Sequence, residues 1–274
     1  MLGSGGITGI AWELGILAGL VECGVDLGEA DLVVGTSAGA VVGAAADYPL
    51  RYRFELAERG PERPARMRPG ALARFVLAMV STPQPERFRV KVGRLALSAK
   101  VESEASRKRT VAGWLPDEPR WPDNLVVTAV DASSGEHRRF DARSGVPLLD
   151  AVAASTAVPG IRPPITIGGR RYVDGGMRSP TNADLAQGHD VVVVLAPDAG
   201  GGPIARPEDE VATLAASGRA VLVRPDTEAR AALGKSIAAK LDPSRRKAAA
   251  LAGYAQAASE ADRILAIWGR QVRP

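Results

Sequence analysis

The sequence is poor in cysteine and histidine, two residues that often mark function in small enzymes. Its 274 residues include one cysteine, Cys23, and two histidines, His137 and His189. A single cysteine excludes an intrachain disulfide, and we interpret Cys23 as a buried structural thiol. Two histidines leave few candidates for the base of a Ser-His-Asp triad. A serine nucleophile in this chain would therefore need its base identified.

The sequence also lacks a hydrophobic run long enough to cross a membrane. The longest candidate, residues 71–80, is interrupted by Arg74 and falls far short of the roughly 20 apolar residues of a spanning helix. The N-terminal segment has no basic region and carries Glu13 within its apolar stretch, which argues against a signal peptide. We expect a cytoplasmic protein, with peripheral attachment to a membrane left open.

The composition is that of a folded protein with a small excess of positive charge. Hydrophobic residues make up 46% of the chain and charged residues 24%, and the formal net charge is +4. This excess is too small to predict a nucleic-acid partner, but it permits attraction to an anionic surface. The length allows one or two domains. We predict that residues 1–200 form one domain and that residues 201–274 add a strand and helices packing on it.

Hydrophobic periodicity alternates between helical and strand patterns along the chain. Helices are expected over residues 9–22, 40–47, 146–155 and 242–268, and strands over 32–34, 124–130, 137–140, 190–196 and 219–223, with two short strands around Gly168 and Gly169. Several of these strands are unbroken apolar runs, which are typical of parallel sheets covered on both faces. The pattern predicts an α/β fold with a mostly parallel central sheet.

Residues 51–70 are dense in arginine and proline and are predicted to be an exposed insertion. The apolar residues 71–80 follow directly, and we expect a core helix there. The alternative is a lid or docking element, because basic side chains beside an apolar patch suit an anionic lipid surface. The arginines that could make such a contact are Arg51, Arg53, Arg59, Arg63, Arg66 and Arg68.

The motif GTSAG places Ser37 between a predicted strand and a predicted helix, in the pattern G-x-S-x-G. Such a sharp turn strains the backbone at the serine and needs small neighbours, here Gly35 and Gly39. It also puts the serine Oγ at a helix N-terminus, where the dipole favours negative charge. Ser37 is therefore a candidate nucleophile, and a plain strand-to-helix turn is the alternative.

A second glycine-rich stretch, residues 3–9, opens the first predicted helix. It is a poor dinucleotide fingerprint, because the preceding strand is almost absent and Asp31 precedes its strand instead of following it. No Gly-Lys-Ser/Thr sequence follows to make a P-loop. We interpret the stretch as a row of backbone N–H groups suited to an oxyanion.

The base that would accept the Ser37 proton is predicted to be a carboxylate. We interpret His137 and His189 as loop histidines. Asp174, in the sequence VDGG, stands where a strand ends and a tight turn begins. A carboxyl group with an ordinary pKa of about 4 accepts a hydroxyl proton poorly, so desolvation would have to raise its pKa. Because Asp-Gly is a common turn pair, a purely structural turn is the alternative.

Together these blocks resemble the patatin-like phospholipases, serine acyl hydrolases with a three-layer α/β/α fold and a Ser-Asp dyad. The resemblance spans residues 3–184 and keeps the family order. The matching blocks are the glycine loop at 3–9, ELGILAGL, GTSAG, VVTAVDASSGE, AASTAVPGIRPP and GGRRYVDGGMRSPTN.

The resemblance implies a role for each matched residue. Ser37 corresponds to the nucleophile and Asp174 to the general base, and the backbone amides of Ser4, Gly5 and Gly6 correspond to the oxyanion hole. The residues that support these motifs are Gly9, Gly35, Gly39, Ser155, Pro159, Gly175 and Gly176. The implied substrate is a lipid or another acyl ester, cleaved through an acyl-serine intermediate. No metal or cofactor is implied.

The chain departs from the family pattern in two places. The family loop reads G-G-G-x-R/K-G, whereas this chain has Ser4 at the first position and Thr8 at the basic one. The missing basic side chain weakens the assignment to phospholipids more than the assignment to hydrolases. Only two residues precede the loop where the family has its first strand, which predicts a shortened strand or a start further upstream.

Three other functions are left open. A soluble esterase or thioesterase for small acyl groups would use the same dyad. A catalytically silent binding protein would keep only the fold. A nucleotide-binding protein is the last alternative.

Overall fold

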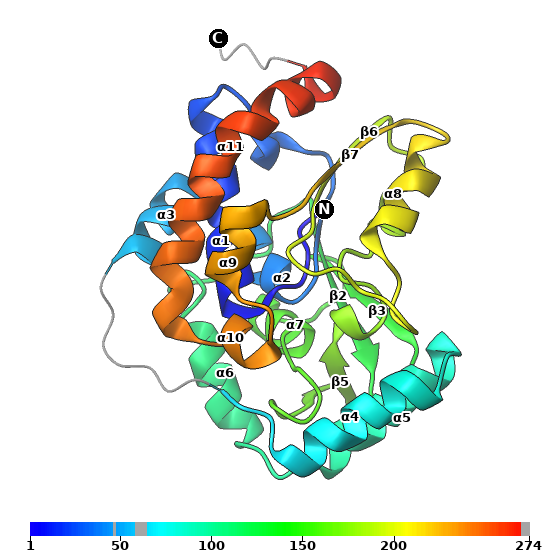
Figure 1. The fold of residues 1–274 in the computed structure, drawn as a ribbon. Helices are drawn as coiled ribbons and strands as arrows, with labels where there is room; N and C mark the ends of the chain where they lie inside the picture. Colours follow the sequence, from blue (N-terminus) through cyan, green and yellow to red (C-terminus); the bar gives the residue numbers. More distant parts are fainter. Residues whose placement is uncertain (46–47, 58–64, 270–274) are drawn as a thin grey trace.

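The computed structural model describes residues 1–45, 48–57 and 65–269, in which short strands alternate with helices (Figure 1). The helices are α1 (Gly6–Glu22), α2 (Ala38–Gly43), α3 (Tyr48–Leu56), α4 (Pro69–Ser81), α5 (Pro85–Ser98), α6 (Glu104–Ala112), α7 (Leu148–Ser155), α8 (Pro207–Ala215), α9 (Thr227–Leu233), α10 (Ile237–Lys240) and α11 (Arg246–Trp268). The strands are β1 (Val33–Gly35), β2 (Leu125–Asp131), β3 (His137–Phe140), β4 (Ile165–Ile167), β5 (Arg170–Asp174), β6 (Val191–Leu195) and β7 (Arg219–Val223). Short 3-10 segments are η1 (Leu27–Glu29), η2 (Gly175–Met177), η3 (Ala183–Ala186) and η4 (Pro243–Arg245).

The strands form a mixed sheet. β1 pairs with β2 in parallel, whereas β2 pairs antiparallel with β3 and with β5, and β4 pairs antiparallel with β5. A second pair, β6 and β7, is parallel. Leu2 forms parallel bridges to both Gly35 and Leu195, so this single residue connects the two groups of strands. It lies where the family's first strand is expected.

The prediction of a mostly parallel sheet is therefore wrong, and the reason lies in the connections. Residues 132–136 join β2 to β3, and Gly168 and Gly169 join β4 to β5. Both glycines have positive φ, 55° and 76°, as a two-residue hairpin turn requires. Connections this short can join only antiparallel strands. The unbroken apolar runs reflect burial on both faces of the sheet and do not report strand direction.

Helices lie on both sides of the strands. α1, α3, α9 and α11 form a block on the left in Figure 1, and α8 lies on the right. α1 is buried all along Ile7–Leu20 because it packs between the rest of the fold and α11. The contact between α1 and α11 is made by very small residues: a Cβ on Gly15 would lie 2.2 Å from the carbonyl oxygen of Ala250. The long alanine-rich helix at the C-terminus thus fits against the helix that begins at the glycine loop.

Most of the predicted elements are present with small shifts at their ends. The first helix begins at Gly6, so the second half of the glycine loop is helical. The predicted C-terminal helix starts with the 3-10 turn η4, where the Asp242 carboxylate accepts a hydrogen bond from the Ser244 amide, and continues as α11. Residues 46–47, at the end of the second predicted helix, lie outside the described residues.

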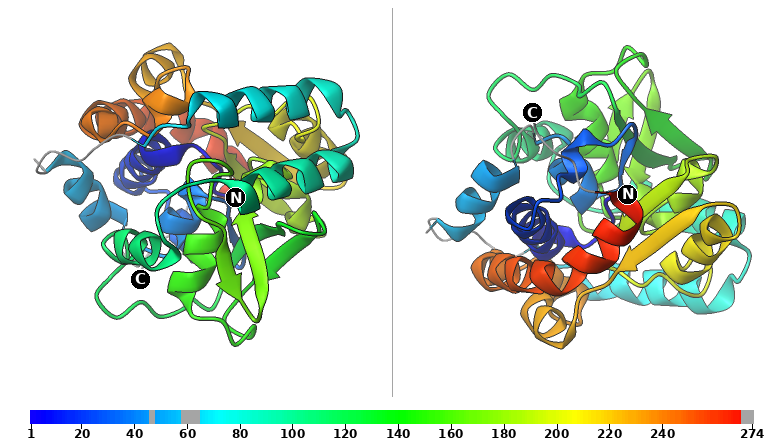
Figure 2. Two further views of the ribbon diagram at one scale, coloured as in Figure 1. Left: turned by 90° about the horizontal axis from the view of Figure 1, so that it is seen from below. Right: turned by 90° about the horizontal axis from the view of Figure 1, so that it is seen from above.

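Two expectations about burial are wrong, and a third holds only in part. Most described residues of the predicted insertion are exposed or half-buried, but Glu55 of α3 is buried and pairs with Arg246 of α11 at 3.0 Å. The helix expected in the core is present as α4, but Ala78 is its only buried residue. Figure 2, seen from below, shows α4 and α5 side by side at the edge of the molecule. Cys23 is exposed rather than buried.

Within the described ranges, no helix combines the length and hydropathy needed to cross a bilayer.

We expect Gly15→Ala to lower the free energy of unfolding by about 1–3 kcal/mol, because the added methyl group forces α1 and α11 apart. Gly70→Ala in α4 is the matched control, since a Cβ there meets no described atom within 4 Å. The control should leave stability unchanged or raise it slightly. Urea unfolding followed by circular dichroism measures both changes. Equal stability of Gly15→Ala and the parent protein would contradict the close helix contact.

Candidate active site

Ser37 lies at a strained turn between β1 and α2. β1 ends at Gly35, α2 begins at Ala38, and Ser37 has a φ of 54°. A positive φ is strained for a residue with a side chain and is found mainly at functional sites. Gly39 allows the turn to close, because a Cβ there would lie 2.1 Å from the carbonyl oxygen of Leu2. The predicted strained serine turn is confirmed.

Ser37 and Asp174 meet in a direct hydrogen bond. The Ser37 Oγ donates to Asp174 Oδ2 at 2.7 Å, and the backbone N–H of Gly176 donates to Asp174 Oδ1 at 2.8 Å. Both side chains are buried, with 5% and 2% of their surface exposed. Asp174 reaches this position because it ends β5, where it pairs in register with Ala129 of β2. The fold thus brings together the two residues that the sequence singled out.

The environment of Asp174 makes it a stronger base than an ordinary carboxylate. Burial raises the pKa of Asp174 to about 7, although the hydrogen bonds from Ser37 and Gly176 lower it. The negative charge of Asp198 also contributes to the raised pKa, and the positive charge of Arg107 opposes it. A base with a pKa close to neutral can accept a proton from a reacting hydroxyl group. The sequence analysis required that desolvation raise the pKa of Asp174, and the structure meets this requirement.

The end of α7 holds both members of the pair. The backbone N–H of Ser37 donates to Ser155 Oγ at 2.8 Å. The backbone N–H of Asp174 donates to the carbonyl oxygen of Ala157 at 3.1 Å. Pro159 is buried in the turn that follows α7. Ser155 therefore supports the site through a direct contact with the backbone of Ser37.

The glycine loop lies beside Ser37, but it does not offer all three predicted amides. The backbone N–H of Ser4 donates to the carbonyl oxygen of Pro180 at 2.7 Å, so Ser4 is not a free oxyanion donor. The first hydrogen bond of α1 runs from the Gly9 N–H to the Gly5 carbonyl, so the N–H of Gly6 precedes the helical ladder. Gly6 lines the same pocket as Ser37 and has a φ of 65°. Gly5 and Gly6 remain the predicted donors.

The motif glycines lie where the elements of the site approach each other most closely. A Cβ on Gly176 would lie 3.3 Å from the Cβ of Ser4, and a Cβ on Gly175 would lie 2.4 Å from the Oγ1 of Thr128. At Gly35 it would lie 2.6 Å from the backbone of Ala40. Gly9 has more room, with the Cβ of Ala38 at 3.4 Å. Side chains at Gly35 and Gly175 would separate the segments that carry Ser37 and Asp174.

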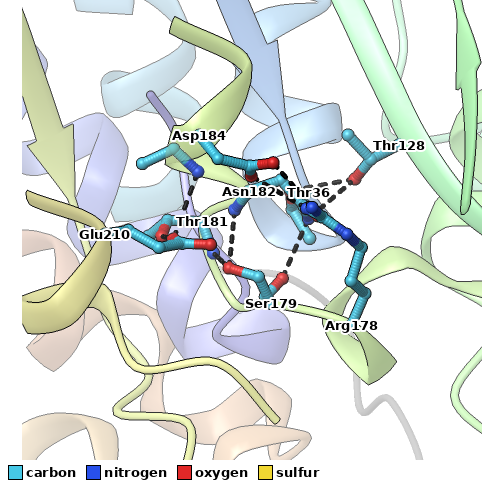
Figure 3. Close-up of polar contacts among 9 residues, drawn as sticks. Thr36, Thr128, Arg178, Ser179, Thr181, Asn182, Asp184 and Glu210 are labelled. Atoms are coloured by element: carbon cyan, nitrogen blue, oxygen red, sulfur yellow. Dashed lines mark hydrogen bonds and ion pairs between the residues drawn. The ribbon is translucent and has the colours of Figure 1, made fainter. Parts of the chain in front are cut away.

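A buried polar network fixes the segment that follows Asp174 (Figure 3). The Asn182 side chain donates to Thr36 Oγ1 at 3.0 Å and to Thr128 Oγ1 at 3.3 Å, and it accepts from Arg178 at 2.8 Å. Thr36 directly precedes Ser37, and Thr128 lies on β2. Asn182 has a φ of 46°, which asparagine tolerates better than most residues. Sequence reasoning did not single out Asn182, and its only signal was its place in the matched segment.

Neither histidine lies at the pair. His137 is on β3 and His189 is in the turn before β6, so the prediction of a loop position fails for His137. Burial, together with the charge of Arg178, lowers the pKa of His137 to about 4. The two histidines line pockets other than the one beside Ser37. Among the described residues, no group of His, Cys, Asp and Glu has the arrangement of a metal site.

The pocket beside Ser37 is small, and the buried side chain of Arg107 forms part of its wall. Its volume is about 30 Å³. Arg107 of α6 lines it together with Trp114, Arg162 and Leu241. Arg107 is 2% exposed. Sequence reasoning missed this residue because it occurs in the charged run SRKRT, which reads as a solvated helix face.

We expect Asp174→Asn to raise stability at pH 8. The folded pKa of Asp174 lies above its unfolded value of 3.8, so ionisation disfavours the folded state and stability falls as pH rises from 4 to 7. Removing the buried charge can raise the free energy of unfolding by up to about 4 kcal/mol at pH 8 and by little at pH 4. Thermal unfolding at both pH values measures the difference.

Asp131→Asn is the matched control. Burial raises the pKa of Asp131, but hydrogen bonds from the amides of Ser134 and Ser133 and from Arg170 lower it by more. This variant should therefore lose stability at pH 8. A loss of stability at pH 8 in Asp174→Asn as well would contradict the raised pKa of Asp174.

Comparison with known proteins agrees with the geometry of the site. The sequence profile of the family described as patatin-like phospholipase matches residues 1–186. This range contains the glycine loop, Ser37 and Asp174, and it covers more than half of the chain. A comparison with curated proteins found no match. The chain belongs to the patatin-like phospholipase family.

Proposed function

We propose that this protein is a lipid acyl hydrolase that cleaves carboxylic esters through an acyl-Ser37 intermediate. The observation that carries the proposal is the 2.7 Å hydrogen bond from Ser37 Oγ to a buried carboxylate whose pKa is about 7. Family membership supports hydrolysis of lipid esters. The strained backbone at Ser37 supports a catalytic turn over a structural one.

The proposed reaction uses groups already in contact. Asp174 Oδ2 accepts the Ser37 proton as Oγ attacks the ester carbonyl carbon, while the Gly176 N–H holds Oδ1 in place. The amides of Gly5 and Gly6, at the positive end of α1, stabilise the oxyanion. The leaving alcohol takes the proton from Asp174. Water then attacks the acyl-enzyme carbonyl while Asp174 takes its proton. Asp174 passes this proton to Ser37 Oγ as the acyl–Oγ bond breaks, which releases the acid and restores the free serine.

A soluble esterase or thioesterase for small acyl groups is a second candidate, favoured by the size of the pocket. Its volume of about 30 Å³ is far below the roughly 300–1,000 Å³ of typical small-molecule pockets. A long acyl chain would need the surrounding side chains to move. Turnover of short p-nitrophenyl esters without turnover of phospholipid vesicles would favour this candidate.

We expect a fluorophosphonate probe to label Ser37, because the probe reacts with activated serines. Labelling should be lost in Ser37→Ala and strongly reduced in Asp174→Asn. Its rate should fall below pH 7 as Asp174 becomes protonated. Mass spectrometry of the folded protein identifies the modified residue. Folded protein that is not labelled at Ser37 would favour the silent binding protein and overturn the mechanism.

We also propose that α4 contacts an anionic membrane surface. Leu72, Val76, Leu77 and Val80 are exposed on this helix. Of the six predicted arginines, Arg53, Arg66 and Arg68 are exposed, whereas Arg51 donates to the carbonyl of Trp114. Arg59 and Arg63 lie outside the described residues. Exposed apolar side chains beside cations are the combination that binds anionic lipid.

Leu77→Glu should reduce binding to vesicles that contain anionic lipid, because it places a negative charge on the exposed apolar face. Leu251→Glu on α11 is the matched control, since Leu251 is also an exposed leucine. Vesicle sedimentation measures both variants. Equal binding of the Leu77→Glu variant and the parent protein would contradict contact through α4.

A further inference from the structure

Arg107 is a buried cation with unused hydrogen-bond donors. Its Nη2 donates to the carbonyl oxygen of Thr156 at 3.2 Å and to Thr156 Oγ1 at 2.8 Å. Its Nε and Nη1 are buried and have no hydrogen-bond partner among the described residues. Buried polar groups are nearly always paired, so each exception needs an explanation. An anion bound by the free donors would provide one.

The surroundings of Arg107 keep it charged without neutralising it. Its guanidinium carbon lies 4.8 Å from the centre of the Trp114 ring, in cation–π contact. Burial lowers the pKa of Arg107 to about 9, with the charge of Arg162 acting in the same direction. Arg107 is still protonated at neutral pH. The negative charges of Glu102 and Asp174 raise this pKa, but no carboxylate of the described residues forms an ion pair with Arg107. A buried charge without an ion-pair partner is costly to the fold, which favours a functional reason for keeping it.

Arg107 stands in the wall of the pocket that contains Ser37. The second arginine of this wall, Arg162, is already paired with Glu102 at 2.8 Å. The N-terminus of α1, at Gly6 and Ile7, lies in the same wall and adds positive potential. The groups that line the pocket therefore make its wall electropositive, and Arg107 contributes two donors that have no partner among the described residues. A neutral ester alone would leave those donors unpaired.

We propose that Arg107 binds an anionic oxygen group of the substrate, a phosphate or a carboxylate, while Ser37 attacks the ester. This inference rests on the proposed function. Thr8 occupies the position of the basic residue in the family loop, and its Oγ1 donates to the carbonyl of Leu233 at 3.2 Å. In this chain the cation for an anionic substrate comes from α6 instead of the loop.

The test compares esters that differ only in charge. In the first pair, lysophosphatidate carries an anionic phosphate on the alcohol side, and monoacylglycerol with the same acyl chain is its neutral counterpart. In the second pair, the p-nitrophenyl hemiester of glutarate carries a carboxylate on the acyl side, and p-nitrophenyl valerate is its neutral counterpart. Arg107→Met should lower kcat/KM for an anionic ester by about 10- to 100-fold, mainly through KM, because a hydrogen bond to a charged group is lost. The matching neutral ester has no charged group for Arg107 to bind and should lose less, so the ratio of kcat/KM for the anionic ester to kcat/KM for the neutral ester should fall.

Arg109→Met is the matched control, because Arg109 is exposed on the same helix. It should change neither member of a pair. Arg107→Lys, which keeps the charge, should restore part of the preference for the anionic ester. A loss confined to lysophosphatidate identifies a phosphate on the alcohol side, and a loss confined to the glutarate ester identifies a carboxylate on the acyl side.

Two results would overturn the proposal: an equal loss on charged and neutral esters, or no loss on either. Fluorophosphonate labelling of Ser37 in each variant shows whether the site is intact. If the parent protein cleaves none of the four esters, the proposed function is wrong and inorganic phosphate becomes the probe. An increase in Tm by phosphate in the parent protein but not in Arg107→Met supports the anion site, and equal responses contradict it.

Discussion

The basicity of Asp174 toward Ser37 depends on the burial of its carboxylate away from water. In water the carboxylate would be a weak base, and the serine hydroxyl would be an unremarkable donor. Burial raises the pKa of Asp174 to about 7 and leaves Ser37 Oγ and the Gly176 amide as its hydrogen-bond donors. The same burial disfavours the ionised carboxylate in the folded state. The basicity of Asp174 and the cost of its charge to the folded state therefore have one physical cause. The rest of the structure must hold Ser37 and Asp174 in contact against that cost.

That support comes from segments far apart in sequence. Ser155 holds the backbone of Ser37, and Asn182 links the segment after Asp174 to Thr36, the residue before Ser37. These groups are satisfied inside the protein, so they hold the turn without competition from water. A rigid frame of this kind allows Ser37 to keep a positive φ that an isolated turn would relax.

The sequence singled out Ser37 and Asp174, which the structure brings into a hydrogen bond, because both residues lie in short motifs with a local geometric reason. These motifs are a strand-to-helix turn and a strand that ends in Asp-Gly-Gly. It did not predict the direction of β3, β4 and β5, because apolar runs report burial and not pairing. The engagement of Ser4 with Pro180 and the burial of Arg107 depend on tertiary contacts. Residues of that kind leave no periodic or local signal, so the electropositive wall was missing from the sequence-based view of the site.

The position of the cation changes what the departure at Thr8 means. From the sequence, the missing basic residue in the glycine loop weakened the assignment to phospholipids. The structure instead places Arg107 in the same pocket from α6, with its Nε and Nη1 unpaired among the described residues. The Arg107 guanidinium is held by Thr156, which follows α7, and by Trp114, which follows α6, and not by the glycine loop. Charge recognition and oxyanion stabilisation would then depend on separate elements, so substrate preference could change without disturbing the amides proposed for the oxyanion hole.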